Sequence, residues 1–218
     1  MVDVLVVGSG IAGLFVATRC ARAGLSTIVV TKKNLSDSST NWAQGGIAAS
    51  LFPDGIQSHI DDTISAGGGL CDENVVKFVV EEAKARIDDL VKSGVQFDLD
   101  GDAYDLTMEG GHSSKRILHS KDATGAEIER ALIAEANSSE NLTMLEEHMA
   151  VDLILEEKDA EIKKIVGIWV LNPSGDVQTI PTQAVILASG GAGQLWRQTT
   201  NPPVATGDGI AMAQRAGA

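Results

Sequence analysis

The sequence has only two cysteines, fewer basic than acidic residues, and no long hydrophobic run. Cys20 and Cys71 lie far apart in no metal-binding or redox spacing, so we expect packed thiols, no metal site and a reducing compartment. Lys and Arg number 17 against 30 Asp and Glu, and the net charge of -13 opposes binding to nucleic acid or to an anionic membrane. No apolar run approaches the ~20 residues of a membrane span, and the first apolar stretch begins too early for a signal peptide. We therefore expect a soluble, cytoplasmic protein.

The chain does contain enough apolar residues for a substantial core. Its 218 residues are 44% hydrophobic, which suits one or two globular domains and excludes a disordered or fibrous protein. There is no internal repeat, no low-complexity segment and no convincing linker. Residues 207–218 show the start and body of a helix without the strand that normally follows, so we expect this chain to be part of a longer protein.

The opening residues predict the element around which the rest of the chain is organised. Residues 4–7 are apolar without polar alternation, as in a strand buried on both faces of a parallel sheet. Gly8 permits a tight turn, Gly10 lets the backbone approach a pyrophosphate, and Gly13 lets helix and strand pack closely. A helical pattern follows and ends at Gly24. This strand, turn and helix predict a dinucleotide site, although the glycines alone would also suit a structural turn.

A second buried strand is predicted for residues 26–31, which completes a βαβ unit. At the end of this strand a Rossmann fold usually places Asp or Glu against the ribose hydroxyls. Lys32 and Lys33 stand there instead. One interpretation is an NADP site in which the lysines hold a 2′-phosphate, and the other is a flavin site with an unusual ribose partner. The lysines alone do not decide between them.

The next segment, residues 34–50, is rich in Ser, Thr and Gly and includes the run SSTNWAQGG at residues 38–46. Such a loop can lay amides and hydroxyls along a phosphate or an isoalloxazine ring, with Gly45 and Gly46 allowing close approach of the backbone. Composition alone suits an ordinary surface loop equally well.

Two helices are predicted beyond this loop, and we expect both to be scaffold. Asp72 is placed to cap a long helix that ends at Gly94. Thr124 and Glu127 have the spacing of a capping box at the start of a second helix. The apolar positions of the first helix are Val75, Phe78, Val79, Ala83, Ile87 and Leu90.

Three β-rich runs, at residues 149–155, 165–171 and 177–187, predict an antiparallel meander with a turn at residues 173–176. The last run ends in the small residues ASGG, and a TGDG segment at residues 206–209 then opens a helix. Open α/β sheets bind cofactors at the carboxyl ends of their strands, so both segments are candidates to face a ligand. Asp208 either bonds a ribose or ribityl hydroxyl or only caps its helix.

Six segments together resemble the succinate dehydrogenase and fumarate reductase flavoprotein superfamily, and within it the L-aspartate oxidase branch most closely. They are VGSGIAG, SSTNWAQGGIAA, TMEGGHSSKRILH, DATG, AVILASGG and TNPPVATGDGIAMAQRAGA, which follow in order over essentially the whole chain. The AQGG and GDGIAMA blocks are far more specific than the first turn, and they favour a flavin over NADP. The resemblance implies an α/β fold: a Rossmann-like FAD-binding domain, with a parallel sheet, helices on both faces and a β-meander. Residues 1–218 would be its N-terminal portion, truncated before the capping domain, with the capping and C-terminal domains absent.

The resemblance also implies which residues hold FAD. Lys32 would take the place of the usual acid, the loop after it would reach along the pyrophosphate to the flavin ring, and Ala150 would lie near the adenine. The implied cofactor-binding residues are Gly8, Ser9, Gly10, Ile11, Ala12, Gly13, Lys32, Ser39, Thr40, Asn41, Trp42, Ala43, Gln44, Gly45, Gly46, Ala150, Ala188, Ser189, Gly190 and Asp208.

In the succinate dehydrogenase branch a histidine of this loop bonds covalently to the flavin, and Ser39 stands at the matching position here. A serine cannot form that histidyl link. We therefore expect FAD to be bound non-covalently.

Glu109 is the one catalytic residue that the resemblance implies within this chain. Aspartate differs from succinate by an ammonium group, and a partly desolvated carboxylate would attract and orient it. On local sequence Glu109 would more often be an exposed loop acid, but its EGGH context resembles the aspartate oxidase block.

Neither histidine of this region, His112 or His119, is assigned as a general base, because in the family's reaction a hydride leaves the substrate for flavin N5. The essential arginine and the carboxylate-binding histidines of the family would lie beyond residue 218. We interpret Lys115 and Arg116 as surface charges without a role.

The function implied is FAD-dependent oxidation of L-aspartate to iminosuccinate, with oxygen or fumarate as electron acceptor, as the first step of de novo NAD biosynthesis. Quinolinate synthase would be a possible partner downstream, and residues 1–218 alone would be inactive. Two alternatives stay open: a soluble fumarate reductase or succinate dehydrogenase flavoprotein, and an inert FAD-binding module or a fragment that binds nothing.

Overall fold

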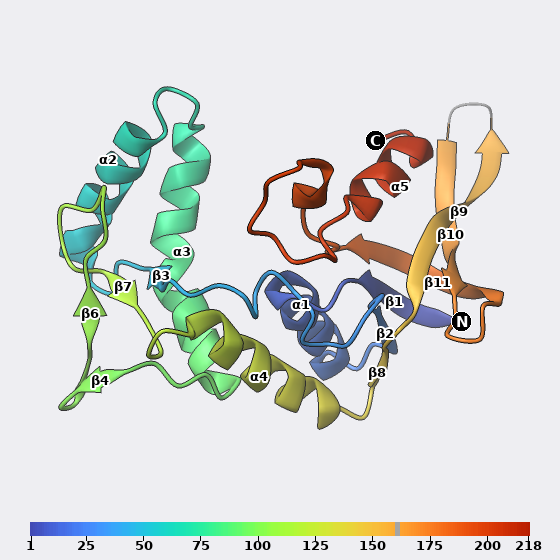
Figure 1. The fold of residues 1–218 in the computed structure, drawn as a ribbon, viewed down its shortest axis with the longest axis horizontal. Coiled ribbons are helices and arrows are strands. Elements are labelled where there is room, and N and C mark those ends of the chain that lie inside the picture. The colour runs from blue at the N-terminus through green and yellow to red at the C-terminus, as the bar shows by residue number, and fades with distance from the viewer. Residues whose placement is uncertain (160–161) are drawn as a thin grey trace. The chain divides into compact units, whose positions relative to one another are not determined.

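The computed structural model describes residues 1–159 and 162–218 and divides into two compact units (Figure 1). The first, the sheet unit, comprises residues 1–42 and 129–218. The second, the helical unit, comprises residues 43–128.

A six-stranded sheet forms the centre of the sheet unit, and its parallel part has the strand order β8–β2–β1–β11. The two strands expected at the start of the chain are confirmed, and Leu5 and Val6 of the first are completely buried. The elements of the unit are β1 (Val2–Val7), α1 (Ile11–Arg22), β2 (Thr27–Val30), most of α4 (Thr124–Asn137), β8 (Leu142–Leu145), β9 (Met149–Asp159), β10 (Ile162–Leu171), β11 (Val177–Leu187), a 3-10 turn at Gly193–Leu195 and α5 (Asp208–Ala216).

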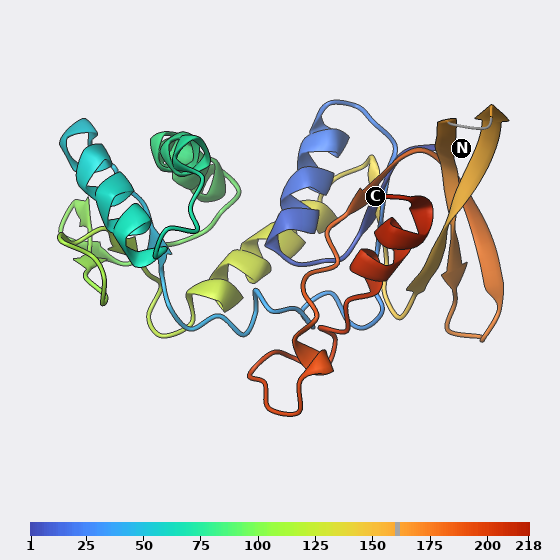
Figure 2. The ribbon, with the colours of Figure 1, turned by 90° about the horizontal axis from the view of Figure 1, so that it is seen from above.

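Alternate residues of β1 face different layers, because successive side chains of a strand point to opposite faces. Val4 and Val6 belong to a cluster with Ala17 of α1. Leu5 and Val7 belong to another cluster, which includes α5 and the strands β9 and β10. Helices therefore cover both faces of the sheet, as the Rossmann-like fold class predicts, and Figure 2 shows α1 and α5 on either side of it.

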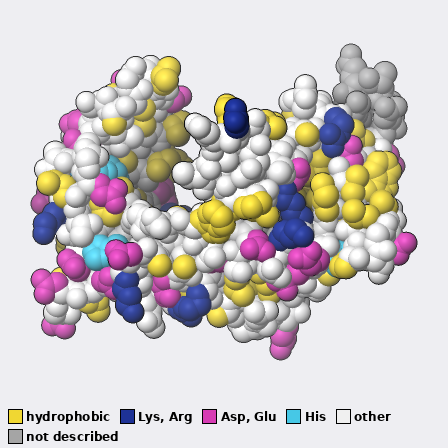
Figure 3. All heavy atoms as spheres, viewed as in Figure 1, with side chains coloured by type: hydrophobic (Ala, Val, Ile, Leu, Met, Phe, Trp, Pro, Cys, Tyr) yellow, Lys and Arg dark blue, Asp and Glu magenta, His cyan; other side chains and the backbone are white. Residues whose placement is uncertain are grey.

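The antiparallel meander of β9, β10 and β11 is confirmed, and β11 also belongs to the parallel sheet. Its first part pairs with β10 as far as Pro181, whereas residues 182–187 run parallel to β1. The segment after β11 is thereby brought beside the end of β1, where the N–H of Ala188 donates to the carbonyl of Val7. Hydrophobic side chains gather over the meander on the face drawn in Figure 3.

The helical unit contains two helices, and both ends of the longer one lie where the sequence predicts. The Asp72 carboxylate accepts the N–H of Asn74 (2.9 Å), and Gly94 has a φ of +96°. Only the far end of the predicted apolar face, with Ile87 and Leu90, is buried, whereas Val75, Phe78 and Val79 are exposed. No described helix is long and apolar enough to cross a membrane. The elements are β3 (Ile47–Ala48), a 3-10 turn at Pro53–Gly55, α2 (Ile56–Ala66), α3 (Glu73–Lys92), β4 (Leu99–Asp100), β5 (Ala103–Tyr104), β6 (Leu106–Thr107) and β7 (Ile117–Leu118).

Candidate functional site

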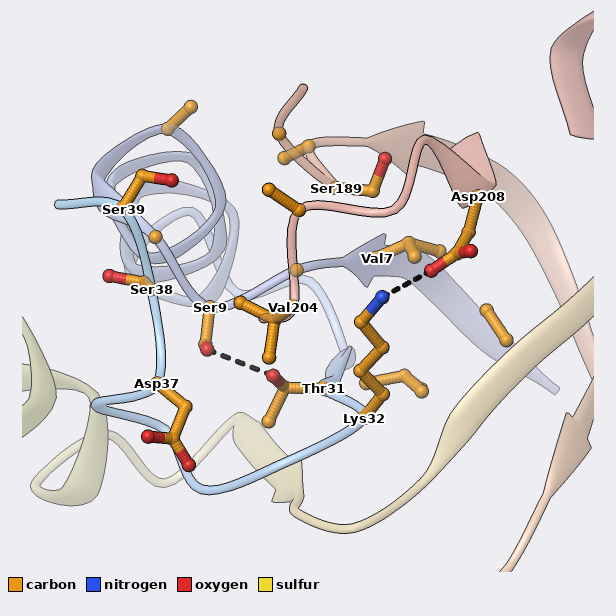
Figure 4. A pocket seen from close by; sticks show the side chains of 18 of the residues that line it. Val7, Ser9, Thr31, Lys32, Asp37, Ser38, Ser39, Ser189, Val204 and Asp208 are labelled. Carbon is orange, nitrogen blue, oxygen red and sulfur yellow. Dashed lines mark hydrogen bonds and ion pairs between the residues drawn. The ribbon is translucent and has the colours of Figure 1, made fainter. Parts of the chain in front are cut away.

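A pocket opens at the carboxyl ends of β1, β2 and β11 in the sheet unit (Figure 4). Its walls are the turn after β1, the segments that follow β2 and β11, the start of β9 and the start of α5. Most of the residues that the sequence assigned to the cofactor meet there: Gly8, Ser9, Gly10, Ile11, Ala12, Lys32, Ser39, Thr40, Ala150, Ala188, Ser189, Gly190 and Asp208.

Two glycines of the turn are required because backbone atoms approach them closely. Gly8 has a φ of +110°, and a Cβ there would overlap the carbonyl oxygen of Ala188. A Cβ on Gly13 would overlap the carbonyl oxygen of Gly8. Gly13 does not line the pocket, so its contribution is the close packing of α1 on β1 that the sequence predicts.

Hydrogen bonds tie the loop after β2 to the glycine turn. The Ser9 hydroxyl donates to the carbonyl of Leu35 (2.8 Å) and is hydrogen-bonded to the Thr31 hydroxyl (3.0 Å), a contact drawn in Figure 4. Thr40 Oγ1 accepts the backbone N–H of Ile11 (3.0 Å) at the start of α1. These bonds hold the glycine turn and the loop in one arrangement around the pocket.

Lys32 and Asp208 form an ion pair across the pocket, as Figure 4 shows. The Thr206 hydroxyl also contacts the Asp208 carboxylate (2.9 Å). Gly207, and not Asp208, is the N-cap of α5, and the Asp208 carboxylate accepts from Lys32 and Thr206. Of the two roles left open for Asp208, the structure therefore favours the one in the pocket.

A buried carboxyl group lies behind the loop that carries Ser39 and Thr40. Glu129 of α4 is 1% exposed, and burial raises its pKa to about 7, an effect that the Ser38 hydroxyl partly offsets. Ser38 Oγ in turn accepts the N–H of Asn41 (3.1 Å). Sequence reasoning did not find Glu129, because an acid in a helix gives no sign of its burial.

The rest of the predicted loop residues lie elsewhere. Gln44, Gly45 and Gly46 line a second, polar pocket within the helical unit, together with Glu109, Asp98, Thr107, His119, Lys121 and Asp122. A Cβ on Gly45 would lie 3.7 Å from Glu109 Oε1, so the carboxylate faces this glycine. The structure thus brings the predicted catalytic residue together with the AQGG segment.

Glu109 sits at the start of a tight turn. The N–H of His112 donates to the carbonyl of Glu109 (3.2 Å), and Gly111 within the turn has a φ of +88°. Only glycine adopts that conformation without strain, which explains the glycine at position 111.

The expectation that Arg116 is a surface charge is wrong. Its side chain is 3% exposed and pairs with Asp62 of α2 (2.6 Å). Its guanidinium also contacts His112 and three serines, at positions 58, 113 and 114. No local sequence pattern indicates this burial. The neighbouring Lys115 is exposed as expected.

The two histidines of this region have structural partners. His119 Nδ1 lies 3.0 Å from Asp98 Oδ2, and His112 Nδ1 lies 3.1 Å from a guanidinium nitrogen of Arg116. An arginine only donates, so His112 Nδ1 is the acceptor in this contact. His59, in the same region, has a lowered pKa, first because of burial and then because of the nearby Arg116 charge.

Three predicted cofactor residues line neither pocket. Asn41 belongs to the turn with Ser38, Trp42 lines a separate apolar cavity of the sheet unit, and the carbonyl of Ala43 accepts the N–H of Gly125. The first pocket also has lining residues outside the predicted cofactor set: Val7, Val30, Thr31, Asp37, Ser38, His148, Met149, Gly191, Val204 and Ala205.

The first pocket suits an anionic dinucleotide. Its floor is glycine backbone at a helix start, Lys32 supplies a positive charge, and Cβ atoms on Gly190 and Gly191 would meet nothing within 4 Å. These features define a dinucleotide-binding domain of the α/β class. The FAD binding domain model matches residues 3–218. The chain belongs to this family, in the form found in succinate dehydrogenases and fumarate reductases, and its cofactor is FAD.

The sequence relatives are L-aspartate oxidases. The protein from Vibrio cholerae is 47% identical over 99% of this chain, and the one from Streptomyces coelicolor is 46% identical over 99%. This chain spans 42% and 38% of those proteins, respectively.

Solved structures agree on the fold. A chain of the Mycobacterium smegmatis Sdh1 complex matches with a TM-score of 0.90 at 32% identity. The match covers 99% of the present chain and 39% of the Sdh1 chain. A variant of Escherichia coli quinol fumarate reductase has a TM-score of 0.89 at 27% identity, with coverage of 98% and 37%.

Proposed function

We propose that the chain is the cofactor-holding, N-terminal part of an FAD-dependent L-aspartate oxidase that makes iminosuccinate. The observation that carries the proposal is the pocket of the helical unit, where Glu109 faces Gly45. L-aspartate oxidases at 43–47% identity over nearly the whole chain support the choice of substrate.

The residues of the first pocket would hold FAD. The backbone from Gly8 to Ala12 would receive the pyrophosphate, and Lys32 and Asp208 would face hydroxyl groups of the cofactor. Bound FAD supplies a two-electron acceptor for the substrate. Because Ser39 stands where the succinate dehydrogenase branch has its flavin-linked histidine, the cofactor is held without a covalent bond.

Glu109 would recognise the substrate's ammonium group. Glu109 is exposed, and its carboxylate makes no hydrogen bond or ion pair among the described residues, so it is available to a cation. A charge-assisted hydrogen bond from an ammonium attracts and orients the substrate, and it discriminates against acids that lack an amine. The protein's part in the reaction is thus to align the substrate and exclude competitors.

The whole protein would catalyse the first step of de novo NAD biosynthesis in the cytoplasm, with oxygen or fumarate as electron acceptor. Iminosuccinate is a reactive imine, so an enzyme that consumes it, such as quinolinate synthase, would act directly afterwards.

Glu109→Gln tests the assignment in a protein that carries residues 1–218 joined to the remaining length of the relatives. We expect KM for aspartate to rise about tenfold, because one charge-assisted contact is lost. KM for fumarate should stay within about twofold of the wild-type value. The matched control is Asp102→Asn, which removes an exposed acid from the β4–β5 turn and should leave both constants unchanged. Equal rises of both KM values in Glu109→Gln would contradict the role.

A fumarate reductase or succinate dehydrogenase flavoprotein is the second candidate, favoured by the fold similarity to such structures. Aspartate-dependent formation of hydrogen peroxide by the same protein separates the two. Peroxide formed with aspartate and not with succinate supports the oxidase.

A further inference from the structure

No side chain in the described part of the chain binds the Glu109 carboxylate. Its position is therefore set by the backbone of the loop between β6 and β7. The base of that loop is closed by the two strands and by the N–H of Arg116, which donates to the carbonyl of Thr107 (3.1 Å). Something else must fix the loop's tip, where the turn of residues 109–112 lies.

We propose that Arg116 is a positioning residue, which clamps this loop to α2 and thereby aims Glu109 into the pocket of the helical unit. The proposal deepens the proposed function and rests on it for the role of Glu109. Arg116 does not line the pocket, so it acts through the loop and not on a ligand.

The clamp consists of one guanidinium with acceptors on two segments. One terminal nitrogen donates to Asp62 (2.6 Å) and to His112 Nδ1 (3.1 Å). The other donates to the hydroxyls of Ser58 (3.0 Å) and Ser114 (2.7 Å). Asp62 and Ser58 belong to α2, whereas His112 and Ser114 belong to the loop.

Asp62 completes the clamp from the other side. One oxygen of its carboxylate accepts both the backbone N–H and the hydroxyl of Ser113, each at 2.8 Å. These bonds and the one from Arg116 hold the pKa of Asp62 well below its usual range, so the pair stays ionised at neutral pH. The loop is thus held through three consecutive residues, 112, 113 and 114, while its N-terminal end at Glu109 bonds to His112.

A planar fork is needed for this geometry. Arginine presents five N–H donors in fixed directions, whereas a lysine ammonium is a compact charge that cannot reach the helix and both parts of the loop together. Arg116→Lys therefore keeps the charge and removes the clamp.

The first test is amide hydrogen exchange in residues 1–218. Arg116→Lys should speed exchange of residues 109–114 about tenfold or more, while exchange within α3 stays as in the wild type. Lys115→Met, which removes the exposed neighbouring charge, is the matched control and should change neither. Unchanged exchange of residues 109–114 in Arg116→Lys would overturn the proposal.

Should Arg116→Lys fail to fold, Ser113→Ala provides a milder variant. It removes the Ser113 hydroxyl, which donates to Asp62 (2.8 Å) and accepts from Arg116 (3.4 Å), and leaves the guanidinium in place. Faster exchange confined to residues 109–114 is expected, and exchange equal to that of the wild type would again overturn the clamp.

The second test is a double-mutant cycle on the protein extended to the relatives' full length. Arg116→Lys should raise KM for aspartate about tenfold with little change in kcat, but it should have almost no further effect in a Glu109→Gln background. If the increases in KM for aspartate caused by the two substitutions multiply in the double variant, Arg116 does not act through Glu109. If Glu109→Gln alone changes nothing, the proposed function fails, whereas the exchange experiment still decides whether the clamp exists.

Discussion

The two pockets of this chain are built from different materials. The pocket of the sheet unit is lined mainly by small and apolar residues and contains one ion pair, whereas the pocket of the helical unit is lined mainly by charged and polar residues. In the first, a glycine is fixed by the carbonyl that touches it. In the second, a catalytic candidate is fixed by an arginine clamp outside the pocket. The difference teaches that a nucleotide site can be shaped by the backbone at strand ends, whereas the aim of a single carboxylate depends on side-chain contacts outside its pocket.

The largest effect should follow from a methyl group at Gly13. A Cβ there overlaps the carbonyl oxygen of Gly8, and neither backbone segment can move without separating α1 from β1. Overpacking of this kind costs about 3 kcal/mol or more, so Gly13→Ala should lower the melting temperature by roughly 6–12 °C and abolish FAD retention.

Gly110→Ala is the matched control in the other pocket's loop, because its Cβ would meet nothing within 4 Å and its φ is not positive. Thermal unfolding should show little change for this variant. A Gly13→Ala protein as stable as Gly110→Ala would remove the distinction between the two pockets.

A smaller effect concerns the pH dependence of stability, which should differ between the two units. Glu129 has a folded pKa of about 7, above the ordinary value of 4.5, so its contribution to stability is present below pH 4.5 and is lost as pH rises to 7. Glu129→Gln should therefore stabilise the protein by up to roughly 3 kcal/mol at pH 8, relative to its effect at pH 4.5. Urea unfolding at both pH values measures this.

Glu140→Gln, an exposed acid of the same unit, should show no such pH dependence. A Glu129→Gln effect that is equal at both pH values would mean that the carboxyl is not the titrating group. The helical unit should behave oppositely: the pKa values of Asp62 and His59 are lowered, so their contributions are lost as pH falls below the unfolded values.

Much of the sheet unit could be predicted from the sequence. Residues 4–7, the glycine turn, the meander and the strand end at residue 188 all follow from local patterns, because each pattern is dictated by backbone geometry. Asp208 could not be decided, since a cap and a pocket residue look alike until Lys32 is placed opposite. Glu129 was missed for a similar reason.

The helical unit was less predictable. The ends of α3 were correct because Asp72 and Gly94 act locally, but the pattern did not show that Val75, Phe78 and Val79 stay exposed. Arg116 was misjudged as a surface charge, since its partner Asp62 lies 54 residues earlier and nothing near Arg116 in the sequence indicates burial.

The most direct test of the central claim is binding of FAD to residues 1–218. Titration of the purified chain with FAD should give one equivalent of bound flavin. Gly13→Ala should abolish this binding, and Gly110→Ala should leave it unchanged. Acid precipitation should leave all the yellow cofactor in the supernatant. No binding of FAD, or tighter binding of NADP, would contradict the account, and flavin that stays with the precipitate would contradict its non-covalent attachment.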